Sequence, residues 1–144
     1  GDTAVVGAGF DDGVGSDSGS AYVYVGSGEV WTQQQKLSAS DAAAGDNFGV
    51  SVSVSGDTVI VGSVFDDAPL FNSGSAYVFT RSGTTWTQQQ KLTASDAAAG
   101  DAFGQSVSLS GDTVVVGAIW DDDGGNQSGS AYVFVRNEGV WTFQ

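Results

Sequence analysis

Cysteine, histidine and methionine are absent from the 144 residues of this chain, and proline occurs once. Without cysteine the chain has no disulfide framework, no zinc-thiolate site and no thiol nucleophile. Without histidine it lacks the usual base of a catalytic triad and the commonest metal ligand of proteins. Any metal ion bound by this chain therefore has to accept oxygen ligands.

Basic residues are also scarce. Four Lys and Arg stand against 17 Asp and Glu, which gives a formal net charge of −13. Nucleic acids and anionic lipids are bound by basic surfaces, so we expect no nucleic-acid partner. The apolar runs are only a few residues long, so we also expect no direct membrane insertion, and the first residues show no secretion signal.

What the chain does contain is a repeat. Gly-Asp-Thr recurs at 1, 56 and 111, a spacing of 55, and residues 1–55 and 56–110 are identical at 37 of 55 positions. The third copy, 111–144, covers part of the unit. No proline-rich or charged linker separates the copies, so we interpret them as one continuous array in which each repeat packs on its neighbour.

Each repeat has the pattern of four short β-strands separated by turns. In the middle copy we predict strands at 48–55, 58–63, 75–81 and 86–94, from runs of alternating or continuous apolar residues. Ser55-Gly56-Asp57-Thr58 is typical of a two-residue hairpin turn. Four antiparallel strands form one blade, and several blades packed face to face form an all-β propeller. A β-sandwich is the alternative fold, but it would not explain why the repeats are so similar in sequence.

Several motifs resemble a known family. Phe48-Gly49-x-Ser51-Val52 is followed by Gly56-Asp57-Thr58, Val61-Gly62 and Gly74-Ser75-Ala76-Tyr77-Val78-Phe79, and the same series recurs from Phe103-Gly104 to Ala131-Tyr132-Val133-Phe134. This series resembles the FG-GAP repeat of bacterial surface proteins and of the integrin α-subunit head. The resemblance implies a seven-bladed β-propeller, an extracellular or cell-surface location, and a role in adhesion.

Aligned with that family, the chain is a single propeller segment of about 2.6 repeats. We expect a partial blade without its first strand at 1–47, a full blade at 48–102 and a blade ending in its fourth strand at 103–144. Because propellers close with roughly 4–8 blades, we expect either an excerpt of a larger ring or a subunit completed by other chains. In isolation such a segment should associate through its open strand edges.

Strand connectivity places twelve of the seventeen acidic residues at one end of the blades. A cluster of oxygen donors suits Ca²⁺, which takes six to eight oxygen ligands in irregular geometry. The alternative is a solvated acidic surface. Integrin-type repeats carry an Asp-x-Asp-x-Asp-Gly-like loop where this chain has a tight turn at 55–57, so their ligands cannot be transferred. The candidate calcium ligands are Asp11, Asp12, Asp17, Asp66, Asp67, Asn72, Asp121, Asp122 and Asp123.

A second acidic motif flanks Ala-Ala-Ala-Gly between blades. Asp41 and Asp46, and Asp96 and Asp101 one repeat later, are either a further oxygen cluster or, the interpretation we favour, turn caps that accept backbone N–H groups. The unchanged recurrence of these residues argues against catalysis, because an active site is normally a single constellation. We therefore expect no enzymatic activity.

Partner recognition is expected where the repeats differ. The middle copy has an apolar stretch, Pro69-Leu70-Phe71, in an otherwise polar loop, and Trp120 replaces Phe10 and Phe65. Pro69-Leu70-Phe71 is a candidate for a protein contact, although the interpretation we favour is that it folds onto the adjoining blade or caps the array. Trp120 is a further candidate for a contact, because it differs from its counterparts and we expect it to be exposed. Trp31, Trp86 and Trp141 recur at the same spacing, which favours packing between blades over sugar stacking.

These observations predict a non-catalytic adhesion or binding module outside the cell. Its acidic loops would present a surface to a protein or glycan ligand, with Ca²⁺ as the candidate cofactor. The alternative is a structural subunit of an extracellular assembly, in which copies of the chain complete one another's blades or strands.

Overall fold

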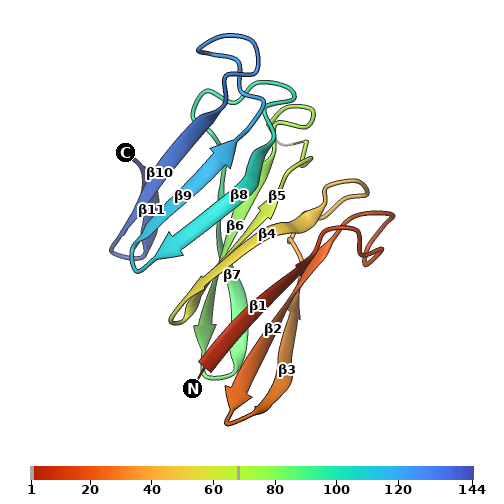
Figure 1. The fold of residues 1–144 in the computed structure, drawn as a ribbon, viewed down its shortest axis with the longest axis vertical. Coiled ribbons are helices and arrows are strands. Elements are labelled where there is room, and N and C mark those ends of the chain that lie inside the picture. The colour runs from red at the N-terminus through yellow and green to blue at the C-terminus, as the bar shows by residue number, and fades with distance from the viewer. Residues whose placement is uncertain (1, 68) are drawn as a thin grey trace.

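The structure is a computed structural model that describes residues 2–67 and 69–144. Gly1, which opens the first Gly-Asp-Thr, and Ala68, which opens the variable stretch of the middle copy, lie outside the described residues. The described chain contains eleven strands in three antiparallel sheets (Figure 1). None of the described residues forms a helix long and apolar enough to cross a bilayer.

Each sheet is a simple meander. The first has the order β1-β2-β3, the second β4-β5-β6-β7 and the third β11-β10-β9-β8. The predicted all-β fold of blade-like antiparallel sheets is therefore confirmed. The strands are β1 (Asp2–Ala8), β2 (Ser20–Ser27), β3 (Val30–Leu37), β4 (Phe48–Ser55), β5 (Thr58–Ser63), β6 (Ser75–Ser82), β7 (Thr85–Leu92), β8 (Phe103–Ser110), β9 (Thr113–Ala118), β10 (Ser130–Asn137) and β11 (Val140–Phe143).

The predicted strands of the middle copy agree closely with β4 to β7. The first two match residue for residue, the third extends one residue further, and the fourth is displaced by one or two residues at its ends. Gly56 has φ +57 at the first central position of the predicted hairpin turn between β4 and β5. This conformation is the one that glycine adopts without strain, which is why the turn falls there.

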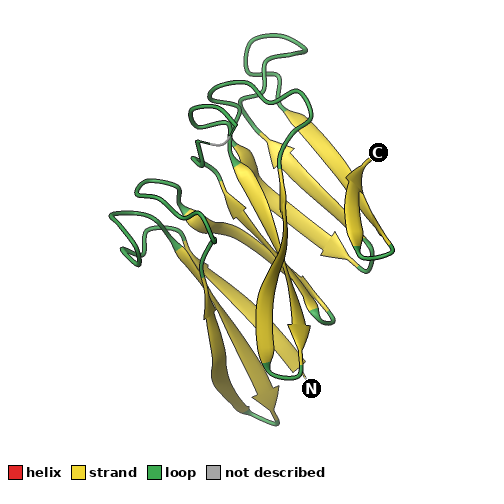
Figure 2. Ribbon diagram, turned by 180° about the vertical axis from the view of Figure 1, so that it is seen from behind, coloured by secondary structure: helices red, strands yellow, loops and turns green. Residues whose placement is uncertain are grey.

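The three sheets stack face to face, and we refer to them as blades one, two and three in chain order. The long connecting loops gather at one end of the stack and the tight hairpin turns at the other, as Figures 1 and 2 show from opposite sides. The predicted separation of the acidic loops from the hairpin turns follows from this meander topology.

Two apolar clusters fill the spaces between the blades. The front face of each blade, defined as the face toward the next blade, contributes Ile60, Ala76 and Val78 in blade two. The rear face of each blade, which points toward the preceding blade, contributes larger residues. At the joint between blades one and two these are Tyr77, Phe79 and Trp86 of blade two. Small aliphatic residues thus meet aromatic ones at each joint, and burial of this area drives the stacking.

The Phe-Gly motif marks the place where the inner strand, β4 or β8, crosses the preceding blade. Phe103 is fully buried, with its ring edge-on to Tyr132 at 5.4 Å. Gly104 has φ +92, and a Cβ there would lie 2.2 Å from the carbonyl oxygen of Ser75 in blade two. Only glycine permits this approach of two backbones, which gives the motif its physical reason.

The Gln-Gln-Gln runs form a β-bulge with a role in stacking. In β7, Gln88 and Gln90 pair with adjacent residues of β6, so Gln89 is the extra residue of the bulge. Its side-chain oxygen accepts the indole N–H of Trp141 in blade three at 3.2 Å. Gln90 forms a closed pair of bonds with the Trp141 backbone, of 2.8 and 2.9 Å.

The same contacts join blades one and two through Gln34, Gln35 and Trp86. Trp86 and Trp141 are thus packing residues between blades, as predicted, but each covers the joint with the preceding blade and not, as expected, the joint with the next one. Trp31, on the rear face of blade one, is 49% exposed.

Candidate functional site

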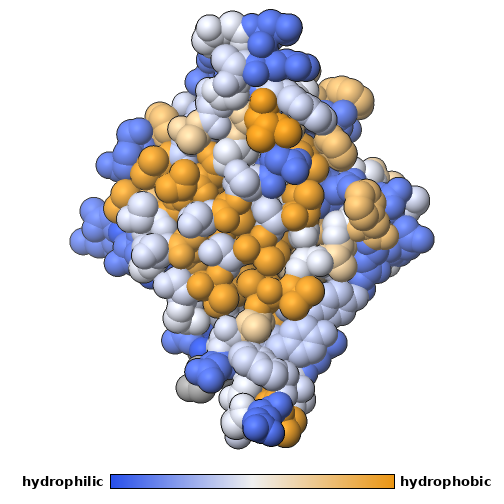
Figure 3. Space-filling view, viewed as in Figure 1, coloured by the Kyte–Doolittle hydropathy of each residue, from blue (hydrophilic) through white to orange (hydrophobic). Residues whose placement is uncertain are grey.

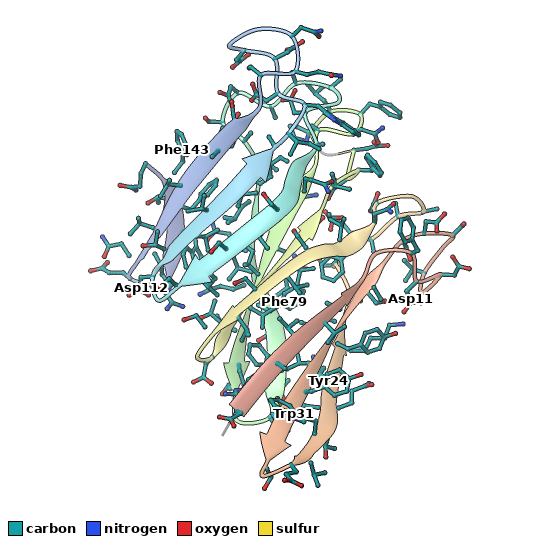
Figure 4. The ribbon with its side chains drawn as sticks, in the orientation of Figure 1. Asp11, Tyr24, Trp31, Phe79, Asp112 and Phe143 are labelled. Atoms are coloured by element: carbon teal, nitrogen blue, oxygen red, sulfur yellow. The ribbon has the colours of Figure 1, made fainter. Side chains whose placement is uncertain are left out.

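The loop end of the stack carries most of the negative charge. Figure 4 shows Asp11 in the loops of blade one and Asp112 at the hairpin turn of blade three, on opposite sides of the view. Two arginines neutralise carboxylates at the hairpin end, where Arg81 pairs with Asp57 and Arg136 with Asp112. The loop end has only two lysines against its many carboxylates, so its charge is far less balanced.

A four-residue polar node lies at the loop end between blades one and two. Tyr77 on β6 contacts Asp66 of its own blade and Asp41 of the linker from blade one, the latter at 2.9 Å. Lys91 on β7 places its ammonium 2.7 Å from Asp41 and 2.8 Å from Asp66. One ammonium therefore bridges two carboxylates contributed by different blades, and ties the linker to the blade that follows it.

Blade one contains part of the same node. Tyr22 donates to Asp11 at 2.6 Å, and Lys36 lies 3.1 Å from the same carboxylate. The hydrogen bond from Tyr22, followed by that from Lys36, lowers the pKa of Asp11. The pair of Lys36 and Asp11 is more exposed than its counterpart in blade two.

In blade three the described residues include the carboxylates and the tyrosine of the node. Tyr132 contacts Asp121 at 2.6 Å and Asp96 at 2.7 Å. Asp123 joins them, so that carboxylate oxygens of Asp96, Asp121 and Asp123 all lie within 4.8 Å of one another. We call these three aspartates the blade-three triad.

The carboxylates of the triad repel one another. The hydrogen bond from Tyr132 lowers the pKa of Asp121, whereas the charge of Asp121 raises the pKa of Asp123. All four basic side chains of the chain pair with other carboxylates. Three closely spaced oxygen donors of this kind are suited to a hard divalent cation, which would relieve the repulsion.

Two of the other predicted ligands have local partners. Asp12 accepts the backbone N–H of Asp17 at 2.9 Å, and Asp67 accepts that of Asn72 at 2.8 Å, so each pair closes its own loop. Asp122 is exposed. Adjacent aspartates thus point to different partners, because one serves the tyrosine and the next serves the loop backbone. Their role as calcium ligands stays a prediction.

The carboxylates that flank Ala-Ala-Ala-Gly have two different roles. Asp46 accepts the backbone N–H of Ala43 at 2.7 Å, and Asp101 accepts that of Ala98 at 2.6 Å, which is the predicted turn cap. Burial raises the pKa of Asp46. Asp41, in contrast, bonds Tyr77 and Lys91 of the next blade, so turn capping does not describe it.

The predicted partner-binding residues lie in the same loop region. Pro69 is exposed, Leu70 is 48% exposed and Phe71 is 68% exposed, so this apolar tip projects into solvent. Trp120 is 43% exposed and stacks on Phe65 of blade two, with ring centroids 6.2 Å apart. Trp120 therefore both packs between blades and offers part of its ring to the surface.

Sequence reasoning missed the tyrosines and lysines of the node. Tyr22, Tyr77 and Tyr132 recur at the repeat spacing, as do Lys36 and Lys91, and this recurrence was the available signal. The recurrence did not reveal that the tyrosine hydroxyl and the lysine ammonium contact the same carboxylates, one of which comes from the linker of the preceding blade. Asp96 was likewise assigned to turn capping, although the structure brings it into the triad.

Comparison with known proteins gives the family. No curated protein matches this chain. The sequence pattern of the FG-GAP repeat matches residues 1–24, 31–79 and 86–134, which together make up most of the chain and correspond to its three repeats. The chain belongs to the FG-GAP repeat family.

Proposed function

We propose that this chain is a non-catalytic binding module of the cell surface or extracellular space, which presents its loop end to a protein or glycan ligand. The observation that supports this role is the gathering of acidic and sequence-variable loops at one end of a regular scaffold. Rigid sheets that carry variable loops are a common arrangement for recognition.

Calcium is the cofactor that we propose for the loop end. The blade-three triad supports it, since Asp96, Asp121 and Asp123 offer hard oxygen donors with no basic side chain of the described chain paired to them. Backbone carbonyls and water would supply the remaining ligands that Ca²⁺ needs. The bound ion would fix the loop of blade three and thereby order the surface that meets the ligand.

Calorimetric titration with Ca²⁺ tests the cofactor. When the free calcium concentration is about 100 times the dissociation constant, the melting temperature of the chain should rise by roughly 5–10 °C. Asp123→Ala should weaken binding at least about tenfold, whereas the neighbouring Asp122→Ala should leave it unchanged. Absence of both heat and stabilisation at millimolar calcium would exclude the ion.

Ligand binding is tested with an array of glycans and cell-surface proteins, probed with the labelled chain in calcium or in chelator. Ligands that bind the labelled chain should no longer bind the Phe71→Ser variant. If calcium orders the loops, they should also fail to bind the chain in chelator. Binding that persists in both conditions would place the contact elsewhere on the molecule.

A second candidate function is structural. It is favoured by the apolar faces at the two ends of the stack, where Val115 and Val133 on blade three and Val6 and Trp31 on blade one are each more than a third exposed. Figure 3 shows apolar residues gathered over β9 and β10 and over the inner strands. Light scattering separates the candidates, because an oligomer that survives chelation and loop mutation supports the structural one.

A further inference from the structure

The apolar tip of blade two, Pro69-Leu70-Phe71, stands on a backbone that is bonded to the rest of the fold. The Gly100 N–H of the following linker donates to the Phe71 carbonyl at 3.0 Å, and the Ser73 N–H donates to the Leu70 carbonyl at 3.0 Å. The side chains of Leu70 and Phe71 are nevertheless exposed. A ligand that covered them would therefore meet a loop that is already ordered, which keeps the entropic cost of binding low.

Blade one builds the same loop without an apolar side chain at either position. There the Gly45 N–H donates to the Ser16 carbonyl at 2.9 Å, and the Ser18 N–H donates to the Gly15 carbonyl at 3.2 Å, which are the counterparts of the two bonds in blade two. Serine and glycine therefore suffice for this backbone conformation. The ring of Phe71 is not needed to form the loop, and adjacent exposed apolar side chains that the fold does not need indicate a contact with another molecule.

The polar groups nearest the tip serve the loop itself. Asp67 accepts the Asn72 N–H at 2.8 Å, and the hydroxyl of the buried Ser73 accepts the Leu70 N–H at 3.3 Å. A sugar that stacked on Phe71 would bury hydroxyl groups, each of which needs a hydrogen-bond partner. An aliphatic side chain beside the ring adds apolar area and no such partner. The tip therefore fits an apolar contact surface of a protein better than a glycan.

Exposed carboxylates lie on both segments that form the base of the tip. Asp67 is on the same loop, and Asp96 is on the linker that the loop contacts through Gly100. The four basic side chains of the chain form their ion pairs with other carboxylates, so none of them neutralises these two. Charge complementarity across an interface therefore calls for lysine and arginine around the apolar contact of the partner.

We propose that Leu70 and Phe71 are the anchor of a protein-docking site, and that the partner is a protein with an apolar contact surface bordered by lysine and arginine. Large side chains at the centre of an interface, surrounded by groups that exclude water, commonly carry most of its binding energy. The inference rests on the proposed function and deepens it, because it chooses a protein over a glycan and places the anchor in blade two.

The test uses a displayed library of random short peptides as the probe, selected on the 144-residue chain. Enriched peptides should combine aromatic or aliphatic residues with an excess of lysine and arginine. One enriched peptide is then synthesised with a fluorescent label, and its dissociation constant is measured by anisotropy. Phe71→Ser should raise this constant at least about tenfold, and Leu70→Ser at least about threefold. Both variants should melt at the wild-type temperature, since both side chains are exposed.

Two further variants separate the anchor from its acidic border and from general stickiness. Asp67→Asn keeps an oxygen acceptor for the Asn72 N–H and removes the charge. It should raise the dissociation constant by about threefold and make the affinity less sensitive to salt. The double variant Phe71→Ser/Ser16→Phe moves the ring to the same loop position in blade one, and it should not restore binding.

Three results would overturn the proposal. The first is recovery of binding in the double variant, because any exposed ring would then suffice. The second is a glycan on the array that binds the chain in a Phe71-dependent manner, which would keep the site and reject a protein as its partner. The third is a set of enriched peptides that bind Phe71→Ser as tightly as the wild type.

Asp123→Ala shows whether the third result also contradicts the proposed function. Enriched peptides that bind Phe71→Ser normally but lose affinity for Asp123→Ala would show that the loop end binds without this anchor, so the proposed function would stand. Peptides that bind both variants as tightly as the wild type would place recognition away from the loop end, and both proposals would fail.

Discussion

Lys91 offers the sharpest test of how the blades are held together. Its ammonium lies between Asp41 of the linker and Asp66 of its own blade and 5.2 Å from the centre of the Tyr77 ring. Lys91→Met removes the charge and keeps most of the apolar stem. We expect the free energy of unfolding to fall by about 2–3 kcal/mol.

That magnitude follows from the burial of the two arms. The side chain of Asp66 is 7% exposed, so its charge-assisted bond contributes about 1.5–3 kcal/mol. The side chain of Asp41 is 47% exposed, so solvent screening limits the second arm to less than about 1 kcal/mol. For a chain of this size the melting temperature should fall by roughly 4–10 °C in a calorimetric scan.

Lys36→Met is the matched control, because it changes the same repeat position in blade one. The ion pair of Lys36 with Asp11 is longer, at 3.1 Å, and the lysine side chain is 43% exposed. The loss should therefore be clearly smaller than for Lys91→Met. Equal losses would refute the reasoning, because they would show that the bridge across the joint adds nothing to an exposed pair.

The pH dependence gives an independent check on Lys91. Burial alone would lower the pKa of Lys91, but its bonds with Asp41 and Asp66 outweigh this effect and raise it above 10.5. Burial alone would raise the pKa of Asp41, but Lys91 and Tyr77 lower it below 3.8. The lysine therefore stabilises the fold below about pH 10 and the aspartate above about pH 4. The difference between wild type and Lys91→Met should be constant between these limits and shrink outside them.

Three further variants test other parts of the molecule. Gly104→Ala should lower the free energy of unfolding, measured by thermal melting, by more than about 2 kcal/mol, because φ is +92 and a Cβ would lie 2.2 Å from a backbone oxygen. Gly83→Ala is the control and should lower it less, because φ is +63 and a Cβ there would have nothing within 4 Å. Gln90→Ala removes two bonds to the Trp141 backbone and should cost about 1–2 kcal/mol in a denaturant titration, and no change would show that solvent replaces both. Phe71→Ser should leave the melting temperature unchanged, since the ring is 68% exposed, while ligand capture on the array is lost; a large drop in stability would assign Phe71 to packing.

The strands were predictable because the repeat provides the same evidence more than once. Apolar alternation, a glycine turn and the 55-residue period all indicate the same boundaries, so local and global signals agree in β4, β5 and β6. The end of β7 was less certain, because Leu92 and Ala94 are both buried although only the first belongs to the strand. Apolar character alone cannot distinguish the last strand residue from a buried linker residue.

The site was less predictable, because its contacts cross the joints between blades. Asp41 and Tyr77 are 36 residues apart, and so are Asp96 and Tyr132. Sequence spacing places a loop at one end of a blade, but it does not give the rotation between blades that decides which carboxylate meets which hydroxyl. The adjacent Asp-Asp pairs appeared to be joint ligands, whereas in the structure Asp11 and Asp66 bond tyrosines and Asp12 and Asp67 accept backbone N–H groups of their own loops.

Repetition separates the scaffold from the candidate function within the acidic loops. The carboxylates that recur in successive repeats are used internally: Asp66 and Asp121 bond tyrosines, and Asp46 and Asp101 cap turns. Asp123 has no acidic counterpart in the other repeats, and it is the residue that turns an interblade contact into a triad. A carboxylate that stabilises the repeated fold should occur in every repeat. Binding should therefore depend on the residues that differ between repeats. The net charge of −13 therefore overstates the recognition surface, because many of its carboxylates already serve the fold.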